Sequence, residues 1–438
     1  MTGRRPTPNE HAPTPALTPS PPRPVRTART LAALVTGAAL VTGCGLIPGT
    51  TAGSADQPIT VMTWAPADTK ATNMPGMPAM AQAYARWVNA HGGIGGHPLR
   101  VLTCNDHNDS VTAARCARSA VDQGAVAVVG SYSQHGRAFL STLESAGVPY
   151  LGGYGASDAE FTSPLSYPVN GGQAALLAGN GEQLGKPCAR TVLVRPDTIA
   201  GDELSPLLNT GLALEHRPAV TDLRVAEDAT DYSGQARQAL GTAGADPTGD
   251  GCVVAVLGDR TDTFFDSFRR MRADYPAVRT ASVLGSVDQS EINRTGGAKS
   301  PYEGAYVTGW YPAADDARWK PMRQVIREQA FGDNRIDPAD TGVQTTWIAY
   351  TILKQVVESL GEGEVSARTV RIALDKGLKV TTGGLTPSLR WGYDHMSAAG
   401  DFPRLVNARV SFQKVEQGRL VATRKGMVDV TNTLAEAP

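Results

Sequence analysis

The stretch Asn89-Ala-His-Gly-Gly-Ile-Gly-Gly-His-Pro-Leu99 joins a helical pattern to a run of strand-forming residues. Before it, Met77–His91 carries apolar residues at helical spacing, and after it Leu99–Thr103 is the next expected strand. Its glycines end the helix and precede a strand instead of opening a helix, so the stretch is a turn and no dinucleotide-binding fingerprint. This helix-turn-strand unit predicts an α/β fold.

The same alternation extends in both directions along the chain and forms two series. We expect two α/β lobes of one architecture, because short apolar runs that alternate with amphipathic helices are typical of a parallel sheet with crossover helices. The first series has strands at Ile59–Thr63, Leu99–Thr103, Ala125–Val129 and Pro149–Leu151, and helices at Met77–His91, Ser110–Gln123 (N-capped by Ser110) and Ala138–Ala146. The second has strands at Thr191–Arg195, Val220–Val225, Cys252–Leu257 and Thr280–Leu284, and helices at Leu204–Leu214, Tyr232–Leu240 and Thr263–Ala273.

Two later segments complete the expected fold. A long helix at Thr341–Leu360 predicts that the chain returns to the first lobe, and residues 385–425 predict a closing β segment. The expected domains are therefore a first lobe at 58–178, a second lobe at 179–305, a return to the first lobe at 306–384, and a closing segment at 385–438 that belongs mostly to the second lobe.

The N-terminal region has the pattern of an export signal. Residues 1–43 hold five Arg against one acid, and the uncharged run Leu31–Val41 follows the basic part. Val41-Thr42-Gly43-Cys44 resembles the lipobox of bacterial lipoproteins, in which the Cys is acylated and becomes the new N-terminus. We expect a signal peptide at 1–43, a lipid-anchored tether at 44–57 with Cys44 as the lipidated residue, and a location on the outer face of the cytoplasmic membrane. The alternative is a transmembrane anchor of about 18–20 residues.

The length and charge of the chain exclude some classes of protein. The 438 residues suit two domains, and the formal net charge of −1 argues against a nucleic-acid partner. After the basic leader, the remainder of the chain is mildly acidic.

The ordered motifs resemble the type I periplasmic binding proteins of the branched-chain amino-acid family. Besides the opening stretch, the matches include Val128-Val-Gly-Ser131, Gly147-Val-Pro149, Asp231-Tyr-Ser233 and Glu303-Gly304-Ala-Tyr-Val. The resemblance covers roughly residues 58–418. It implies two Rossmann-like lobes joined by three crossings and a hinge, with a small ligand held in the cleft between them and no cofactor.

The resemblance also implies ligand-binding residues in the first lobe. Tyr132, Ser133 and Gln134 match the loop after the third strand, which receives the ligand carboxylate in the family. Gly155 and Ser157, with Tyr154 beside them, match the loop after the fourth strand, which serves the amino and carboxylate groups. The alternatives are an N-capping turn for the first loop and a Gly-rich structural turn for the second.

The second lobe departs from the family pattern. Ala200 stands where the family usually offers an aromatic, so that wall of the cleft is missing or is supplied by Tyr132, Tyr154 or Trp64. Asp288, or else Asp259, is the candidate partner of a ligand ammonium, and a solvated loop carboxylate is the alternative for each. Asn73 is a further candidate in the first loop.

The four remaining cysteines are expected to form two disulfides, because export permits them. Cys104 ends the second strand and Cys116 lies in the next helix, while Cys188 and Cys252 stand at the starts of strands that are neighbours in a doubly wound sheet. A metal site is not expected, because there is no C-x-x-C and the seven His lack ligand spacing.

No P-loop, H-E-x-x-H or G-x-S-x-G motif is present, so an enzyme is not expected. The resemblance implies a monomeric receptor that captures an amino acid or related solute and delivers it to the permease of an ABC importer. The alternative is a ligand-sensing lipoprotein that signals to a membrane partner without transport.

Overall fold

The computed structural model describes residues 57–70, 72–245, 250–397 and 399–436, which all belong to the compact unit Thr51–Pro438. The expected signal peptide, Cys44 and the tether up to residue 56 lie outside the described residues. Within the described part of the chain, no helix is both long enough and apolar enough to cross a membrane.

The first lobe is built on a parallel sheet with the strand order β2-β1-β3-β4-β5. Its strands are β1 (Ile59–Trp64), β2 (Leu99–Cys104), β3 (Ala127–Val129), β4 (Tyr150–Leu151) and β5 (Ser166–Tyr167). The chain moves outward from β1 to β2 and then continues from β3 on the other side of β1. This reversal of direction is the place where doubly wound sheets bind ligands.

The Gly-rich turn at residues 89–99 fixes the start of β2. The Asn89 side chain donates to the Leu99 carbonyl at 2.9 Å and accepts the Leu99 N–H at 2.7 Å, so it pairs with the first residue of the strand. Gly93 has φ of 79°, and a Cβ there would lie 2.2 Å from the carbonyl oxygen of His97. The glycine is therefore required by both its backbone conformation and the close approach of the chain.

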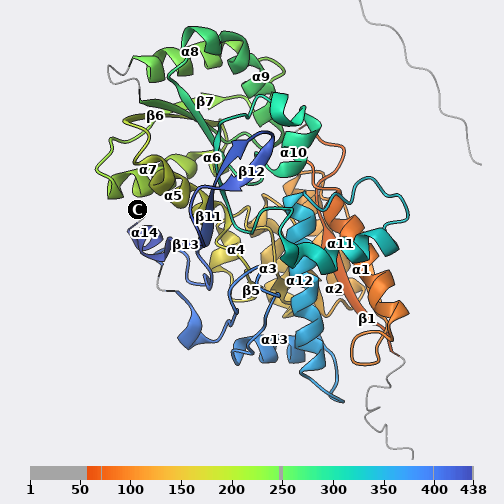
Figure 1. Cartoon of the computed structure of the whole chain (residues 1–438). Helices are drawn as coiled ribbons and strands as arrows, with labels where there is room; N and C mark the ends of the chain where they lie inside the picture. Colours follow the sequence, from red (N-terminus) through yellow and green to blue (C-terminus); the bar gives the residue numbers. More distant parts are fainter. Residues whose placement is uncertain (1–56, 71, 246–249, 398, 437–438) are drawn as a thin grey trace, which may run out of the picture. The chain divides into compact units, whose positions relative to one another are not determined.

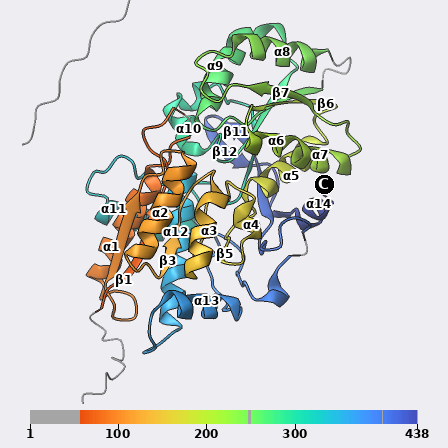
Figure 2. The same ribbon diagram turned by 180° about the vertical axis from the view of Figure 1, so that it is seen from behind.

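Helices cover both faces of the first sheet. Ile59 and Val61 pack in one apolar cluster with α1 and α12, whereas Met62 and Trp64 pack in another with α2 and α3, because side chains alternate along a strand. The helices of this lobe are α1 (Gly76–Ala90), α2 (Ser110–Asp122), α3 (Gly136–Ala146), α4 (Ala159–Thr162), α11 (Lys320–Gln329), α12 (Thr341–Glu358) and α13 (Ala367–Asp375). Figure 2 shows α2 and α3 side by side.

The expected N-cap of α2 was wrong by one residue. The Asp109 carboxylate accepts the Thr112 N–H at 2.8 Å, and Ser110 is the first residue of the helix. An aspartate one position earlier can make the same capping bond as a serine and adds a negative charge at the helix N-terminus.

The second lobe repeats the topology of the first. The parallel strands β7-β6-β8-β9-β10 have the same order, and antiparallel β11 and β12 extend the sheet beyond β10. Its strands are β6 (Arg190–Pro196), β7 (Thr221–Val225), β8 (Gly251–Ala255), β9 (Arg279–Val283), β10 (Tyr306–Gly309), β11 (Arg409–Glu416), β12 (Arg419–Ala422) and β13 (Val428–Asp429). The prediction of two α/β lobes of one architecture is confirmed.

The helices of the second lobe are α5 (Gly172–Leu184), α6 (Ile199–Asp202), α7 (Leu204–Leu214), α8 (Ser233–Gly244), α9 (Thr261–Met271), α10 (Gln289–Arg294) and α14 (Thr431–Ala435). Figure 1 shows α8 and α9 together, and they share an apolar cluster with β6 and β8. Turns of 3₁₀ helix lie at Gly258–Arg260, Arg272–Asp274, Gly297–Lys299, Ala317–Trp319 and Tyr393–His395.

The chain changes sheets three times, after β5, after β10 and before β11. Side chains tie the three crossings together: Asn170 donates to the Tyr311 hydroxyl at 3.0 Å, and Asn407 donates to the Val169 carbonyl at 3.0 Å. Because β10 at 306–309 belongs to the second sheet and α12 packs against α1, we propose that the return to the first lobe begins after residue 309 and not at 306.

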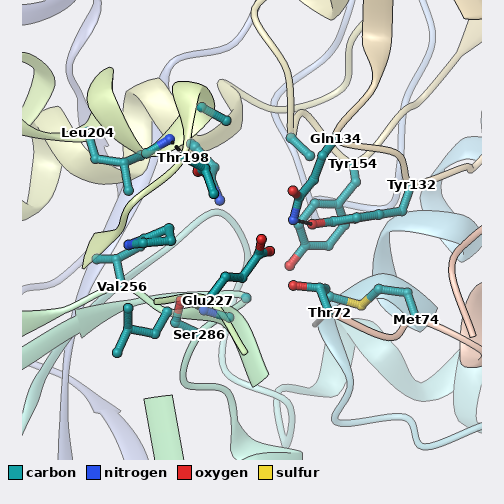
Figure 3. A pocket seen from close by; sticks show the side chains of 18 residues that line it. Thr72, Met74, Tyr132, Gln134, Tyr154, Thr198, Leu204, Glu227, Val256 and Ser286 are labelled. Atoms are coloured by element: carbon teal, nitrogen blue, oxygen red, sulfur yellow. Dashed lines mark hydrogen bonds between the residues drawn. The ribbon is translucent and has the colours of Figure 1, made fainter. Parts of the chain in front are cut away.

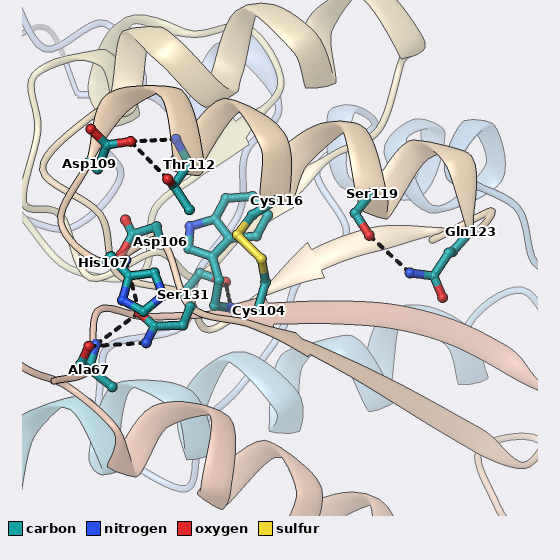
Figure 4. The surroundings of a disulfide bond; sticks show 12 residues. Ala67, Cys104, Asp106, His107, Asp109, Thr112, Cys116, Ser119, Gln123 and Ser131 are labelled. Carbon is teal, nitrogen blue, oxygen red and sulfur yellow. Dashed lines mark hydrogen bonds between the residues drawn. A yellow bond between two sulfur atoms is a disulfide. The ribbon is translucent and has the colours of Figure 1, made fainter. Parts of the chain in front are cut away.

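Both predicted disulfides are present. Cys104 and Cys116 join the end of β2 to α2, with Cα atoms 5.8 Å apart, as Figure 4 shows. Cys188 and Cys252 join the starts of the neighbouring strands β6 and β8, with Cα atoms 5.6 Å apart. The first disulfide lies at the carboxyl end of its sheet and the second lies at the amino end.

Candidate ligand-binding cleft

A cleft lies between the loops that follow the carboxyl ends of the strands in both sheets. Its inner part is a cavity of about 60 Å³, and it opens into an outer part of about 1160 Å³ that shares several of its lining residues. The inner cavity is lined by Thr72, Met74, Tyr132, Gln134, Tyr154, Ala156, Gln173, Pro196, Thr198, Ala200, Gly201, Leu204, Glu227, Val256, Leu257, Gly258, Gly285 and Ser286. This is the position at which parallel α/β sheets present ligand sites.

Two tyrosines form the wall contributed by the first lobe. The rings of Tyr132 and Tyr154 are in edge-to-face contact with centroids 5.0 Å apart, and Tyr154 makes a second such contact with Trp310. Gln134 donates to the Tyr132 hydroxyl at 3.2 Å. The Tyr154 hydroxyl is buried and has no hydrogen-bond partner among the described residues, and burial raises the pKa of this group. A ligand that accepted or donated a hydrogen bond here would remove an unfavourable buried polar group.

The second lobe contributes a carboxylate that the sequence analysis missed. Glu227 follows β7 and lines both the inner and the outer part of the cleft. Figure 3 shows its carboxylate between the two walls, directed toward Thr72 and Tyr154. Burial raises its pKa, and the nearby His135 opposes that rise. The position directly after a predicted strand at Val220–Val225 was the available signal, because ligand residues gather at the carboxyl ends of strands.

The structure brings three of the predicted site residues, Tyr132, Gln134 and Tyr154, to the inner cavity. Gly155 and Ser157 lie in the wall of the outer part. Ser133 lines neither part, and its hydroxyl accepts the His135 N–H at 3.2 Å.

The loop after β4 is held by a buried carboxylate from its own chain. Glu160 is 1% exposed and accepts the N–H groups of Gly155, Ala156 and Ser157 at 3.0, 2.9 and 3.2 Å. Burial raises the pKa of Glu160 to about 7, and these three backbone bonds oppose the rise. The backbone donors of this loop are therefore already in use.

Asn73 and Asp259 contact each other across the mouth of the cleft. The Asp259 carboxylate accepts both the backbone N–H of Asn73 at 2.9 Å and its side-chain amide at 3.2 Å. Beside this contact, Arg260 donates to the Lys70 carbonyl at 2.8 Å. These bonds join the first lobe to the second, and neither Asn73 nor Asp259 lines the cavity.

Asp288 lies away from the cleft. Its carboxylate caps α10 by accepting the Glu291 N–H at 2.9 Å and also accepts the N–H and hydroxyl of Thr341. Burial raises the pKa values of both Asp288 and the neighbouring Asp340. Asp288 thus links the second lobe to the start of α12.

Ala200 lines the cleft at the position where an aromatic was expected, and Thr198 caps the short helix that carries it. The aromatic surface comes from Tyr132 and Tyr154 instead. Trp64, the third aromatic considered, packs against Phe139 with centroids 5.2 Å apart and does not line the cavity. Among the described residues, no group of three or more His, Cys, Asp or Glu is placed to hold a metal ion.

Residues 67–403 match the family model of the periplasmic binding proteins. The chain belongs to this family. The resemblance stated from the motifs is therefore confirmed, and membership makes the chain an extracytoplasmic solute-binding protein and not an enzyme.

Solved structures of periplasmic binding proteins share its fold. A substrate-binding periplasmic protein from Ralstonia solanacearum superposes with a TM-score of 0.68 at 16% identity, covering 83% of this chain and 99% of that one. An ABC transporter solute-binding protein from Rhodopseudomonas palustris HaA2, in complex with p-hydroxybenzoic acid, gives 0.68 at 14% identity, with 87% and 100% covered. A leucine-binding protein from Thermotoga maritima gives 0.65 at 14% identity, with 85% and 99% covered. None of the curated proteins is detectably similar in sequence.

Proposed function

We propose that this protein is a lipid-anchored receptor that captures one small polar solute between its lobes and delivers it to an ABC importer. The cleft supports this proposal, because its lining comes from loops after strands of both sheets and is therefore completed only when both lobes approach the solute. The cross-cleft bonds of Asn73 and Arg260 are contacts of a kind that hold such lobes together.

One observation carries the proposal. The buried Tyr154 hydroxyl of the first lobe and the Glu227 carboxylate of the second lobe face the same cavity, and the hydroxyl has no partner among the described residues. Buried polar groups without partners are rare in native proteins, and a bound solute would satisfy them. One solute-binding protein of this fold is in complex with p-hydroxybenzoic acid, and another is named as a leucine-binding protein. The fold therefore accepts more than one class of solute.

A thermal-shift screen of amino acids, amines and small acids on the purified chain tests the proposal. A solute at about 100 times its Kd should add about 2.7 kcal/mol to the free energy of unfolding. Tyr154→Phe should weaken binding by about fivefold, because one hydrogen bond is lost. Tyr393→Phe is the matched control, because Tyr393 is 89% exposed and lies outside the cleft. If no solute raises the melting temperature, the proposed function is wrong.

The lipid anchor is tested separately. We expect the chain expressed in a bacterium that processes lipoproteins to incorporate an alkyne-labelled fatty acid and to sediment with membranes, whereas Cys44→Ser does neither. A Cys44→Ser variant that is labelled and sedimented as well as the wild type would contradict lipidation at this residue.

Uptake of the identified solute distinguishes import from sensing. Deletion of the gene should lower uptake of the radiolabelled solute at low concentration. Uptake that is unchanged while a cellular response to the solute disappears would favour the sensing alternative. We also propose that the protein is monomeric, which light scattering of the purified chain checks directly.

A further inference from the structure

We infer that the cleft selects a solute with an ammonium group and without a carboxylate, a monoamine with an apolar or aromatic body. This inference rests on the proposed function, because it names the class of solute for the same cleft. Two independent observations carry it: the backbone donors of the loop after β4, one of the two loops expected to receive a carboxylate, are already occupied, and the inner cavity presents a single charge, which is negative.

Glu160 occupies one of the two expected carboxylate sites. It accepts three consecutive backbone N–H groups, those of Gly155, Ala156 and Ser157, and the Ser157 hydroxyl lies 3.4 Å from the same carboxylate. A ligand carboxylate at this loop would meet a buried carboxylate and no unused donor from these three residues. Two like charges in a site of low dielectric repel each other strongly.

The other expected carboxylate site, the loop after β3, makes some of its polar contacts within the protein. The Tyr132 N–H donates to the Trp64 carbonyl at 3.0 Å, and the Ser133 hydroxyl accepts the His135 N–H at 3.2 Å. The Tyr132 hydroxyl takes the Gln134 amide. The side chains of this loop that line the inner cavity, Tyr132 and Gln134, are uncharged and offer no cation to a ligand anion.

Among the described residues that line the inner cavity, Glu227 is the only one with a charged side chain. No described Lys, Arg or His lines this part of the cleft. His135 in the outer part acts on Glu227 through space, and no hydrogen bond or ion pair joins the two among the described residues. In the outer part Arg137 is paired with Asp158 at 2.8 Å, so it is not a free partner for an anion. A partly buried carboxylate is stabilised by a cation, which an ammonium-bearing solute would provide.

The remaining lining fits the body of such a molecule. Tyr132 and Tyr154 provide aromatic surface that attracts an ammonium group by cation–π interaction, and Met74, Leu204 and Val256 provide apolar contacts. An amine bound between Glu227 and the tyrosines would place its body against this apolar surface.

Matched solutes that differ only in charge test the inference. One set is L-tyrosine, tyramine and 3-(4-hydroxyphenyl)propionate, and the other is L-leucine, 3-methylbutylamine and 4-methylpentanoate, each titrated by calorimetry into the purified chain in an acetate-free buffer. We expect the amine of at least one set to bind about tenfold or more tightly than its acid. Glu227→Gln should weaken amine binding by about tenfold or more, because the buried charge pair is lost.

Asp228→Asn is the matched control, because it removes a neighbouring exposed acid that lines neither part of the cleft. It should leave amine affinity within about twofold, as expected for a screened surface charge. Tighter binding of an acid than of its amine, binding that Glu227→Gln does not change, or the absence of binding by both amines overturns the inference. In each of these cases the proposed function survives if another solute in the screen binds, and it fails only if none does.

Chemical rescue tests the occupied amides directly. Glu160→Ala removes the internal carboxylate, and propionate should then raise the melting temperature of the variant while leaving the wild type unchanged. Propionate that stabilises the wild type equally, or that fails to stabilise a folded Glu160→Ala protein, contradicts the claim. The matched solute series decides the inference even if this variant does not fold.

Discussion

The two lobes share one strand order but present different surfaces to the cleft. In the first lobe Glu160 accepts the backbone N–H groups of the loop after β4, so these donors are already in use. In the second lobe Ala200 leaves space where an aromatic was expected, and Glu227 faces the cavity. The comparison suggests that the first lobe is a preorganised platform, whereas the second lobe supplies the charge that selects the solute.

The disulfides sharpen this comparison and give the largest expected effect. Removing the Cys188–Cys252 bond by a double Ser substitution should lower the free energy of unfolding by about 4 kcal/mol, and removing Cys104–Cys116 by about 3 kcal/mol, because the first closes the longer loop. Urea denaturation of the purified variants measures both.

The two disulfide variants should differ in solute binding. Loss of Cys104–Cys116 should weaken binding, because Asn108 and Ser110 beside it line the outer cleft. Loss of Cys188–Cys252 should not, because it lies at the amino end of its sheet. Equal loss of affinity in the two variants would contradict the claim that only the Cys104–Cys116 disulfide supports the cleft.

Glu160→Ala should destabilise the protein by about 3 kcal/mol, because it leaves three buried or half-buried backbone amides without an acceptor. Glu227→Ala should change stability by less than about 1 kcal/mol, because no backbone group depends on that side chain among the described residues. Chemical denaturation compares the two variants. A larger loss of stability from Glu227→Ala than from Glu160→Ala would mean that the second-lobe wall, and not the loop after β4, depends on its carboxylate for folding.

Asp288→Ala should lower stability by about 1–2 kcal/mol through loss of the α10 cap and the bonds to Thr341, without weakening solute binding. Unfolding and calorimetry together separate this variant from Glu227→Gln. That variant should keep its stability and bind the solute more weakly. Weaker binding in the Asp288 variant with unchanged stability would restore the sequence-based expectation for this residue.

The pH dependence of stability tests Glu160 in a second way. The pKa of Glu160 is raised from 4.5 to about 7 in the folded protein, so the folded state binds more protons than the unfolded state between these values. The contribution of this group to stability is therefore greatest below about pH 4.5 and is lost as the pH rises through about 7. Glu160→Gln should flatten this part of the stability profile, measured by urea unfolding from pH 4 to 8. An identical profile in the variant would show that Glu160 does not titrate in this range.

The fold was predictable from the sequence because it depends on local signals. The Gly-rich turn, the helical spacing of Met77–His91 and the capping of α2 act over a few residues, and the helix bounds and the capping residue were each misplaced by one position. The disulfide pairs were also predictable, because the doubly wound order makes β6 and β8 neighbours. The position of each strand end then identified the loops that form the cleft.

The chemistry of the cleft was less accessible to sequence reasoning. The loop residues Gly155 and Ser157 gave no sign that Glu160 folds back onto the amides of this loop, because that depends on burial of α4. Asp288 and Glu227 both follow predicted strands closely, but only the packing of α12 against Asp288 removes it from the cleft. The resemblance therefore located the binding loops, whereas the partners of their polar groups required the three-dimensional structure.

The most direct test of the central claim is to fill the cleft. Ala200 is exposed and lines both parts of it, so Ala200→Trp should occupy the space between the lobes with little effect on folding. Ala213→Trp, at an exposed position of α7 outside the cleft, is the control. Calorimetry with the solute identified in the screen should show binding lost in Ala200→Trp and retained in Ala213→Trp. Undiminished binding in Ala200→Trp would contradict capture between the two lobes.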